Sequence, residues 1–386
     1  MMTKRRVLAI TGIRSEYFLQ RPIFQAIMDH PELDLELVVT GAHLSPLHGY
    51  TVKQIEADGF PISDRIESLI NSDRDAARLR GAANQLQVLT HIVDAKRPDW
   101  LLAPADREEA MTMALCGAYL GIPIAHYGAG DHVVGNVDDM VRHAVSRLAH
   151  LLLTTHEEAR ARLIRAGEEE WRVHDVGHSG LDRIRTTPQL SREELARDLG
   201  VTKLDDRYLV IIQHPLSSEM SDAGAQMRET LMAAAELEMQ TFVSYPNSDP
   251  GSGQIIAAIR EFESNSLFKA FKNIPDVQFV NLLRGATALL GNSSLGLLEA
   301  PFLHLAAINV GARQKARHHS DNIFFVNCDR NAIARQVRAI IDDPEVRKRV
   351  ENCANPFGDG HTGQRVADLL AQTPIDAKLL NKDLNY

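Results

Sequence analysis

The sequence has few cysteines and no long apolar run. Cys116, Cys328 and Cys353 are its only cysteines, and their odd number and wide spacing fit neither a complete disulfide set nor a zinc motif. We therefore expect free thiols in a reducing cytoplasm. No apolar run approaches the roughly 20 residues that span a bilayer. The apolar run after the basic start "MMTKRR" is too short for a secretory signal.

The chain also lacks an excess of positive charge. Its formal net charge is -9 at pH 7, whereas proteins that bind nucleic acid or an anionic membrane present a basic stripe. We expect neither partner, although a local group of basic residues could still hold a small anion. A length of 386 residues, with 44% hydrophobic and 24% charged residues, suits a soluble protein of two domains.

Short apolar runs alternate with longer amphipathic stretches along the chain. This alternation predicts βαβ units and mostly parallel sheets. About twelve strands are too many for one ordinary open sheet, so we predict an α/β protein of two doubly wound, Rossmann-like domains. The runs read as strands are "RRVLAIT", "LDLELVVTG", "DWLLAPAD", "IPIAHYG", "HLLLTT", "RVHDVG", "YLVIIQHP", "QTFVSYP", "VQFVNL", "ATALLGN", "LAAINVG" and "NIFFVN".

A polar segment near residue 186 separates the two predicted domains, which cover residues 1–185 and 186–360. It contains "TPQLSREEL", which predicts a helix start with Ser191 as the cap and acidic residues in the first turn. The tail "PIDAKLLNKDLNY" is expected to be peripheral.

Polar residues follow many of the predicted strands. Ligands of open parallel sheets bind beyond the carboxyl ends of the strands, so these segments predict a ligand cleft between the two domains. They are "TGIRSEY", "ADREE" and "HYGAGD" in the first half, and "QHPLSSE", "YPNSDPGSG", "GNSSLGLLEA" and "GARQKAR" in the second.

The segment "GNSSLGLLEAP" is the sharpest local signal. Small residues around Ser293 and Ser294 let backbone approach a ligand closely, and the start of a helix favours a phosphate. Glu299, about one and a half turns into that helix, could accept the hydroxyls of a ribose. Arg313 could pair with the phosphates. The alternatives are a plain serine-capped helix and a solvated basic loop.

Two further residues at strand ends are candidates for proton transfer. Asp106 could act as a general base, and His214 could carry a proton or stabilise a leaving phosphate. The alternatives are that Asp106 caps the next helix and that His214 is structural. We predict no metal site, because no histidine pair has ligand spacing and the adjacent His318 and His319 suit one metal poorly.

Three long blocks carry a resemblance to a known family. They are "VTGAHLSPLHGYTVKQIEADGF", "VDDMVRHAVSRLAHLLLTT" and "GNSSLGLLEAPFLHLAAINVGARQKAR". They resemble the UDP-N-acetylglucosamine 2-epimerase superfamily, and more closely its hydrolysing branch, which serves sialic and legionaminic acid synthesis. The resemblance implies a glycosyltransferase-B-like fold, whose last helix, here about residues 361–372 within the segment 361–386, packs back on the first domain.

The resemblance also implies a reaction. A base removes the C2 proton of the sugar while the nucleoside diphosphate leaves C1, and water then adds to the resulting glycal. The products are the free 2-epimeric sugar and UDP. This chemistry needs no nicotinamide, in agreement with the absence of a G-x-G-x-x-G fingerprint after the first strand, and no metal or other cofactor. A nucleotide sugar is the expected substrate, and a homodimer or homotetramer the expected assembly.

Matching positions inherit roles from the family. Asp106 and Asp138 match catalytic acids, and His214 matches a histidine that assists departure of the diphosphate. Ser293, Ser294, Glu299 and Arg313 match the nucleotide site, and Arg14, with Ser15 beside it, matches the region facing the base and diphosphate. The same blocks contribute further substrate-site candidates, which are His43, Arg142, Asn292, Gly296 and Gln314. Arg107 is the last such candidate, because Ala105-Asp106-Arg107 matches the family's Gly-Asp-Arg after the fourth strand.

The chain departs from the family after the fifth predicted strand. The family pattern there is His-Ile-Glu-Gly-Gly-Glu, whereas this chain has "HYGAGD", with Gly128 in place of the first Glu and Asp131 in place of the second. Glycine transfers no proton, so Asp131 or Asp138 is expected to take over, with His132 as a further candidate. The departure keeps two other hypotheses open: hydrolysis of the nucleotide sugar without inversion at C2, and a binding protein without turnover.

Overall fold

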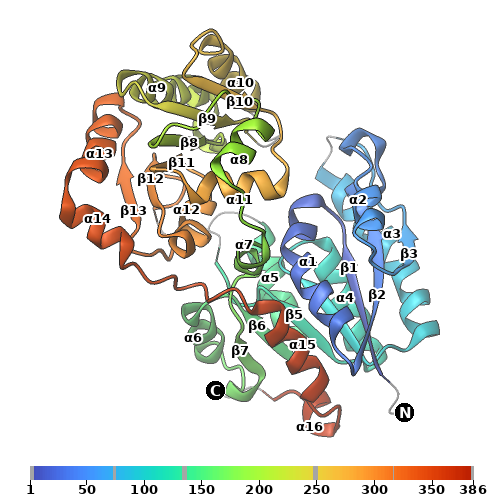
Figure 1. The fold of residues 1–386 in the computed structure, drawn as a ribbon. Coiled ribbons are helices and arrows are strands. Elements are labelled where there is room, and N and C mark those ends of the chain that lie inside the picture. Colours follow the sequence, from blue (N-terminus) through green and yellow to red (C-terminus); the bar gives the residue numbers. More distant parts are fainter. Residues whose placement is uncertain (1–3, 73–74, 133–136, 247–250, 316, 384–386) are drawn as a thin grey trace. The chain divides into compact units, whose positions relative to one another are not determined.

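The chain divides into two compact units. The computed structural model describes residues 4–72, 75–132, 137–246, 251–315 and 317–383. Unit 1 comprises Met1–Arg183 and Phe357–Tyr386, and unit 2 comprises Ile184–Pro356. Each unit is a parallel sheet covered by helices, as Figure 1 shows. Two Rossmann-like α/β domains were predicted, and the structure confirms them.

Unit 1 contains a seven-stranded sheet in the order β3-β2-β1-β4-β5-β6-β7. Every strand pair in it is parallel. The strands are β1 (Arg5–Thr11), β2 (Leu33–Thr40), β3 (Ile62–Ile66), β4 (Trp100–Pro104), β5 (Ile124–Tyr127), β6 (Leu151–Thr154) and β7 (Val173–Asp175). The helices are α1 (Arg14–Asp29), α2 (Val52–Ala57), α3 (Asp75–Lys96), α4 (Glu108–Leu120), α5 (Val137–Leu148), α6 (Glu157–Arg165), α15 (Thr362–Gln372) and α16 (Ala377–Leu380), with short 3-10 turns at Gly41–Leu44, Pro46–His48 and Glu170–Arg172.

Unit 2 contains a six-stranded sheet in the order β10-β9-β8-β11-β12-β13, again parallel throughout. The strands are β8 (Tyr208–Ile212), β9 (Gln240–Ser244), β10 (Phe268–Phe271), β11 (Ala288–Gly291), β12 (Ala306–Val310) and β13 (Ile323–Val326). The helices are α8 (Arg192–Asp198), α9 (Ala223–Glu236), α10 (Ser252–Glu261), α11 (Asp276–Arg284), α12 (Leu295–Leu298), α13 (Arg330–Asp342) and α14 (Pro344–Glu351), with 3-10 turns at Ser217–Asp222 and Ala300–Leu303. Helix α7 (Gly180–Thr186) contains the boundary between the units.

The central strands are apolar on both faces because both faces are covered. In β1, Val7 and Ala9 join one buried cluster while Leu8 joins the cluster on the opposite face. Side chains alternate along a strand, so a strand buried on both faces reads as an unbroken apolar run. This burial explains why the central strands were visible in the sequence.

The end of the chain packs onto unit 1. Helix α15 adds Val366 and Leu370 to the core that α1 also lines. Gly363 allows close contact between the two helices, since a β-carbon there would lie 2.5 Å from the carbonyl oxygen of Pro22. The indole Nε1 of Trp100, on β4, donates to the carbonyl of Leu370 at 3.0 Å.

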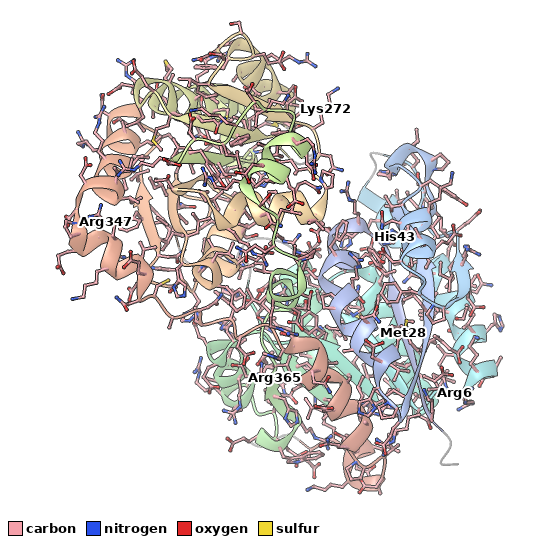
Figure 2. All side chains as sticks on the ribbon, viewed as in Figure 1. Arg6, Met28, His43, Lys272, Arg347 and Arg365 are labelled. Carbon is pink, nitrogen blue, oxygen red and sulfur yellow. The ribbon has the colours of Figure 1, made fainter. Side chains whose placement is uncertain are left out.

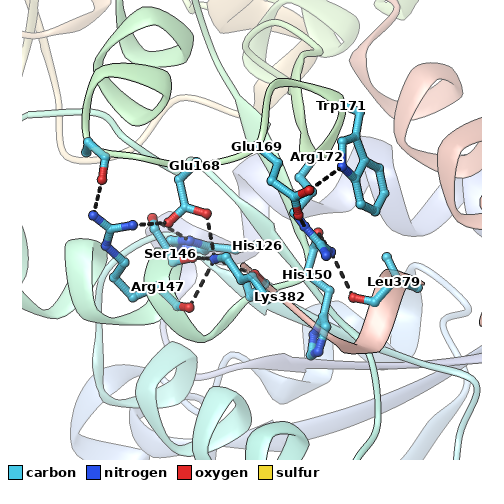
Figure 3. Close-up of polar contacts among 12 residues, drawn as sticks. His126, Ser146, Arg147, His150, Glu168, Glu169, Trp171, Arg172, Leu379 and Lys382 are labelled. Carbon is cyan, nitrogen blue, oxygen red and sulfur yellow. Dashed lines mark hydrogen bonds and ion pairs between the residues drawn. The ribbon is translucent and has the colours of Figure 1, made fainter. Parts of the chain in front are cut away.

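The tail beyond α15 is mostly exposed, but buried side chains of unit 1 hold it in place. Arg172 is fully buried, and its guanidinium donates to the carbonyl oxygens of Leu379 and Lys378 at 2.8 and 2.9 Å. Lys382 donates to three carbonyls at the end of α5 and pairs with Glu168 at 2.7 Å. Figure 3 shows Arg172 beside Leu379 and Lys382 beside Glu168.

Three elements differ from the sequence-based prediction. The run "VQFVNL" was predicted as a strand, which is wrong, because it lies in helix α11. Strands β3 and β10 were missed.

The predicted cap at Ser191 is confirmed: its side chain accepts from the backbone of Glu194 and completes a capping box. Among the described helices, none is long and apolar enough to cross a membrane.

Candidate functional site

The candidate residues follow the strands at which each sheet reverses its order. In unit 1 the order reverses between β1 and β4, and in unit 2 between β8 and β11. Chain segments that leave neighbouring strands in opposite directions open a crevice at the carboxyl edge, where ligands of such sheets bind. Arg14 and Asp106 follow β1 and β4, while His214 and Asn292 follow β8 and β11.

In unit 1, one arginine joins two of the predicted acids. Arg142, on α5, is buried and pairs with the carboxylate of Asp106. Its other terminal nitrogen lies 3.2 Å from Oδ2 of Asp131. A planar guanidinium holds two carboxylates in fixed directions, so Arg142 orients both acids at the carboxyl ends of β4 and β5.

A histidine from the next strand also contacts this group. His156, after β6, caps α6 by accepting from the backbone of Ala159 through Nδ1. Its Nε2 therefore carries the proton in the neutral ring, and it lies 3.4 Å from Oδ1 of Asp131. Asp131 is thus bound between Arg142 and His156.

Asp106 does not cap helix α4. The cap position belongs to Arg107, which makes no side-chain capping bond. The capping alternative for Asp106 is therefore wrong, and its observed partner is Arg142. Because this carboxylate binds a cation and not the amides of a helix, it can still act as a reactive acid or base.

Asp138 belongs to a second ion-pair group. Arg78, on α3, donates to Asp138 at 2.9 Å and to Glu108 at 2.7 Å. The arginine thus links α3, α4 and the start of α5. The sequence carried no signal for Arg78, because it lies inside a helix and far from every strand end.

A buried pair of glutamates lies next to Arg107. Glu16 and Glu109 are both buried, and neither oxygen of Glu16 has a hydrogen-bond partner among the described residues. Burial, and then the neighbouring charge of Glu108, raises the pKa of Glu109 to about 7. Burial, and then the charge of Glu109, raises the pKa of Glu16 well above its ordinary value. The pair thus favours a protonated carboxyl near neutral pH.

A cavity of about 470 Å³ opens beside these glutamates within unit 1. Glu109 and Arg107 form part of its wall. The remaining lining residues are Ile13, Gly41, Ala42, Ser68, Leu69, Ile70, Ser72, Ala77, Arg78, Gly81, Ala82 and Glu108. A mixed polar and apolar wall of this kind suits a small organic ligand better than a bare ion.

His43 and Arg14 occupy different surroundings at this edge. His43, labelled in Figure 2, is buried after β2, and its ring nitrogens lie 3.1 Å and 2.7 Å from the hydroxyls of Thr11 and Thr51. Burial lowers its pKa to about 4, so His43 is neutral at pH 7. Arg14 and Ser15 are exposed at the start of α1.

The glycines after β5 have backbone reasons to be glycine. Gly128 has φ of +79° and Gly130 has φ of +69°, values that other residues rarely adopt. A β-carbon on Gly130 would also lie 2.6 Å from Leu163. His126 is structural: burial lowers its pKa to about 3, and Nε2 lies 2.6 Å from the carbonyl oxygen of Ala105. The segment "HYGAGD" therefore consists of the end of β5 and a tight turn over residues 128–130, which is followed directly by Asp131.

In unit 2, Asn292 ties two of the predicted segments together. Its side chain accepts from the backbone nitrogen of His214 at 2.7 Å and donates to the carbonyl of His214 at 2.8 Å. The backbone carbonyl of Asn292 accepts from Arg313 at 3.1 Å and from Gln314 at 3.0 Å. Asn292, His214, Arg313 and Gln314 thus converge from three loops on one edge of the sheet.

The helix after "GNSS" is much shorter than predicted. Helix α12 covers only Leu295–Leu298, and Glu299 is its C-terminal cap rather than a residue inside a long helix. A helix of four residues has only a small dipole, so its N-terminus favours a phosphate less than the sequence-based prediction assumed. Gly296 faces the sheet, where its β-carbon would lie 3.2 Å from that of Ala307, so its role here is packing.

The structure therefore brings the candidates together in two groups. In unit 1, Asp106 and Asp131 meet at Arg142, whereas Asp138 pairs with Arg78 and Arg107 pairs with Glu108 and Glu109. The group in unit 2 contains His214, Asn292, Arg313 and Gln314, with Ser293, Ser294 and Glu299 on the same segment as Asn292. Sequence reasoning missed Glu16, Glu109, Arg78 and His156. The two glutamates could have been found, since "RSEY" and "DREE" follow strands.

Comparisons with known proteins agree on one family. The sequence model of the UDP-N-acetylglucosamine 2-epimerase family matches residues 25–371. The chain is 32% identical over 378 residues, 98% of each chain, to the UDP-N,N'-diacetylbacillosamine 2-epimerase (hydrolyzing) of Legionella pneumophila. It is 32% identical to a UDP-N-acetylglucosamine 2-epimerase of Neisseria meningitidis, over 83% of each chain. Its fold is similar to the crystal structure of a UDP-GlcNAc 2-epimerase from Neisseria meningitidis bound to UDP-GlcNAc, with a TM-score of 0.76 and 16% identity over 95% of this chain and 100% of that one.

Proposed function

This chain belongs to the UDP-N-acetylglucosamine 2-epimerase family, and from that premise we propose that it is a hydrolysing 2-epimerase. Its substrate is a UDP-linked rather than GDP-linked 2-acetamido sugar, either UDP-GlcNAc or a 4-amino-6-deoxy derivative. Its products are UDP and the free 2-epimer, which serves a nonulosonic acid of a surface glycan. The named relatives are 2-epimerases of UDP-N,N'-diacetylbacillosamine and of UDP-N-acetylglucosamine.

The pairing of Asp106 with Arg142 is the observation that carries this proposal. Removing a C2 proton needs a carboxylate held at a fixed place, and Arg142 holds Asp106 and Asp131 together at the carboxyl edge of the unit 1 sheet. In the first step a carboxylate takes the C2 proton as the C1–O bond to the diphosphate breaks. In the second, water adds to C1 of the glycal and a proton returns to C2 from the opposite face.

We expect the nucleotide to bind to the group of residues in unit 2. Arg313 offers a cation for the diphosphate, and Glu299 a carboxylate for the ribose hydroxyls. His214 stands at the end of the neighbouring strand, held through its backbone by Asn292, where it would assist departure of UDP. The reaction as written needs no cofactor.

One observation favours a second candidate function. Position 128 is glycine in a left-handed turn, so the acid that the family carries there is missing. A positioned acid or base typically contributes 10²–10⁴-fold to a rate. Without it, the enzyme could release UDP and sugar by hydrolysis with the C2 configuration unchanged.

Incubation with a panel of UDP- and GDP-linked amino sugars in deuterated water tests the proposal. NMR of the products should show free 2-epimer with deuterium at C2. We expect Asp106→Asn to lower turnover by about 10²-fold or more while UDP affinity, measured by calorimetry, is unchanged. Product without deuterium and with unchanged C2 configuration would establish the second function instead.

The cellular setting and assembly form part of the same proposal. An enzyme that consumes nucleotide sugars works where these are made, which is the cytoplasm. We propose a homodimer or homotetramer with no nucleic-acid or membrane partner, and light scattering of the purified protein determines its mass.

A further inference from the structure

Three metal-ligating side chains meet on α5 and on the loop before it, apart from the acids discussed above. Nδ1 or Nε2 of His132 and His143 and a carboxylate oxygen of Asp139 all lie within 4.8 Å of one another. Asp139 and His143 are four residues apart on α5, so both project from the same face. His132 reaches this face from the end of the segment after β5.

The distances match those between ligands of one metal ion. Nδ1 of His132 lies 3.3 Å from Oδ2 of Asp139, and Nε2 of His143 lies 3.8 Å from the same oxygen. A tetrahedral Zn²⁺ with bonds of about 2.0–2.1 Å places its ligand atoms roughly 3.3–3.4 Å apart. Small side-chain rotations therefore suffice to bring all three atoms into bonding distance.

The surroundings allow an ion to enter the site and water to complete its coordination shell. The side chains of His132 and His143 are 47% and 42% exposed, so both rings can rotate and a fourth ligand can come from solvent. The single carboxylate lowers the charge of the bound ion.

We propose that His132, Asp139 and His143 form a binding site for a first-row divalent cation, with Zn²⁺ as the preferred ion. Two imidazoles and one carboxylate, with a fourth position left to water, is a ligand set typical of zinc. Oxygen-seeking ions such as Mg²⁺ prefer carboxylates and carbonyls and should bind weakly. The site is separate from the chemistry of the proposed function and does not depend on it.

The site lies one residue from an acid of the unit 1 group. The backbone nitrogen of His132 donates to Oδ1 of Asp131 at 2.9 Å, and Arg142 lies between Asp139 and His143 on α5. A bound ion would thus fix the position of His132 relative to the helix that carries Arg142.

Calorimetry on tag-free, chelator-treated protein tests the proposal without any assay of activity. We expect one Zn²⁺ per chain, and Co²⁺ in its place should give the visible absorption of a four-coordinate site. His143→Ala and His132→Ala should each weaken binding at least 10-fold, because even loss of an outer-shell partner costs 10–100-fold. His91→Ala, which removes an exposed histidine of α3, is the control and should bind as the parent does.

Two results would overturn the proposal. One is an absence of Zn²⁺ binding by the parent protein at millimolar Zn²⁺. The other is undiminished binding in both His132→Ala and His143→Ala, which would place the ion at another site, such as the thiols. Circular dichroism of each variant establishes that it is folded, which is expected because both rings are largely exposed.

Discussion

At the scale of single residues, the surroundings of a carboxyl group decide what it does. Asp106, Asp131 and Asp138 each have an arginine partner. Glu16 and Glu109 are instead buried, and a neighbouring carboxylate, Glu109 for Glu16 and Glu108 for Glu109, raises the pKa of each further. The sequence identified the three aspartates by their position after strands and by family resemblance. It could not identify the glutamate pair as unusual, because their burial depends on β1 and β4 being neighbours in the sheet, which brings Glu109 against Gly12.

The buried glutamate makes stability depend on pH in a defined direction. The pKa of Glu109 is about 7 in the folded protein, above the ordinary value of about 4.3 for the unfolded chain. Between these values the unfolded state loses the proton while the folded state keeps it. Stability therefore falls as pH rises through this window and levels off above about pH 7.

Glu109→Gln should remove the part of this pH dependence that Glu109 contributes and leave the part that comes from Glu16, whose pKa is also raised. We compare the free energy of unfolding in urea at pH 5 and pH 8. Between these values, the free energy of unfolding of the variant should rise relative to that of the parent by about 3 kcal/mol at most. Glu351→Gln, which changes an exposed glutamate on α14, serves as the control. Parallel pH curves for Glu109→Gln and the parent would contradict the prediction.

Gly128 is a second residue whose conformation can be tested. Its φ of +79° costs an L-amino acid about 1–2 kcal/mol, although a β-carbon there would contact Ala105 no closer than 3.5 Å. Gly128→Ala should therefore destabilise the protein by about that amount in urea unfolding. Gly253→Ala is the matched control: Gly253 lies in helix α10 with open space around it, and alanine there should be neutral or stabilising by up to roughly 1 kcal/mol. Equal effects of the two substitutions would show that the backbone argument is wrong.

At the scale of elements, the prediction found the buried central strands and the edge strands β7 and β13, and it failed at the opposite edge of each sheet. The two missed strands, β3 and β10, are both edge strands. In β3, "ISDRI" exposes alternate residues, so it lacks the apolar run that marks a central strand. The error at "VQFVNL" has a different cause, since a run of six residues fits a helix and a strand equally well. Its extension through Arg284 and its start after Pro275 reveal the helix.

The C-terminal tail is attached to unit 1 by contacts whose loss should have a clear effect on stability. Arg172 is fully buried and donates to carbonyls of Lys378 and Leu379, while its Nε donates to Glu169 at 2.6 Å. The Trp171 ring also stacks against the guanidinium, whose carbon lies 4.2 Å from the ring centre. No sequence pattern marks such a residue, because its partners lie some 200 positions away.

Arg172→Ala should destabilise the protein by about 3–5 kcal/mol, since it leaves several buried groups unpaired. Urea unfolding measures the loss, and hydrogen exchange should become faster in Ala377–Leu380. Arg338→Ala, which removes a surface ion pair with Glu236, should cost less than about 1 kcal/mol. A loss of stability no larger than that of the control would show that Arg172 does not anchor the tail.

At the scale of the whole molecule, the two units carry different parts of the proposed reaction. Each unit has its own sheet and its own buried clusters. The acids lie in unit 1, and the residues proposed for the nucleotide lie in unit 2. Binding and chemistry can therefore be examined separately, with UDP alone reporting on unit 2.

Saturating UDP should slow hydrogen exchange in unit 2. A ligand at 100 times its Kd adds about 2.7 kcal/mol to the stability of the state that binds it, so the segments around Asn292–Glu299 and Arg313–Gln314 should exchange more slowly. Glu299→Ala should weaken UDP binding by roughly 1–3 kcal/mol, because the ribose hydroxyls lose their partner, and should reduce this protection at the same UDP concentration. Asp106→Asn should leave the protection from exchange unchanged, because Asp106 lies in unit 1 and is not among the residues proposed to bind the nucleotide. Unchanged exchange throughout unit 2 in the parent protein, despite UDP binding measured by calorimetry, would place the nucleotide elsewhere and remove the basis for assigning Arg313 and Glu299 to it.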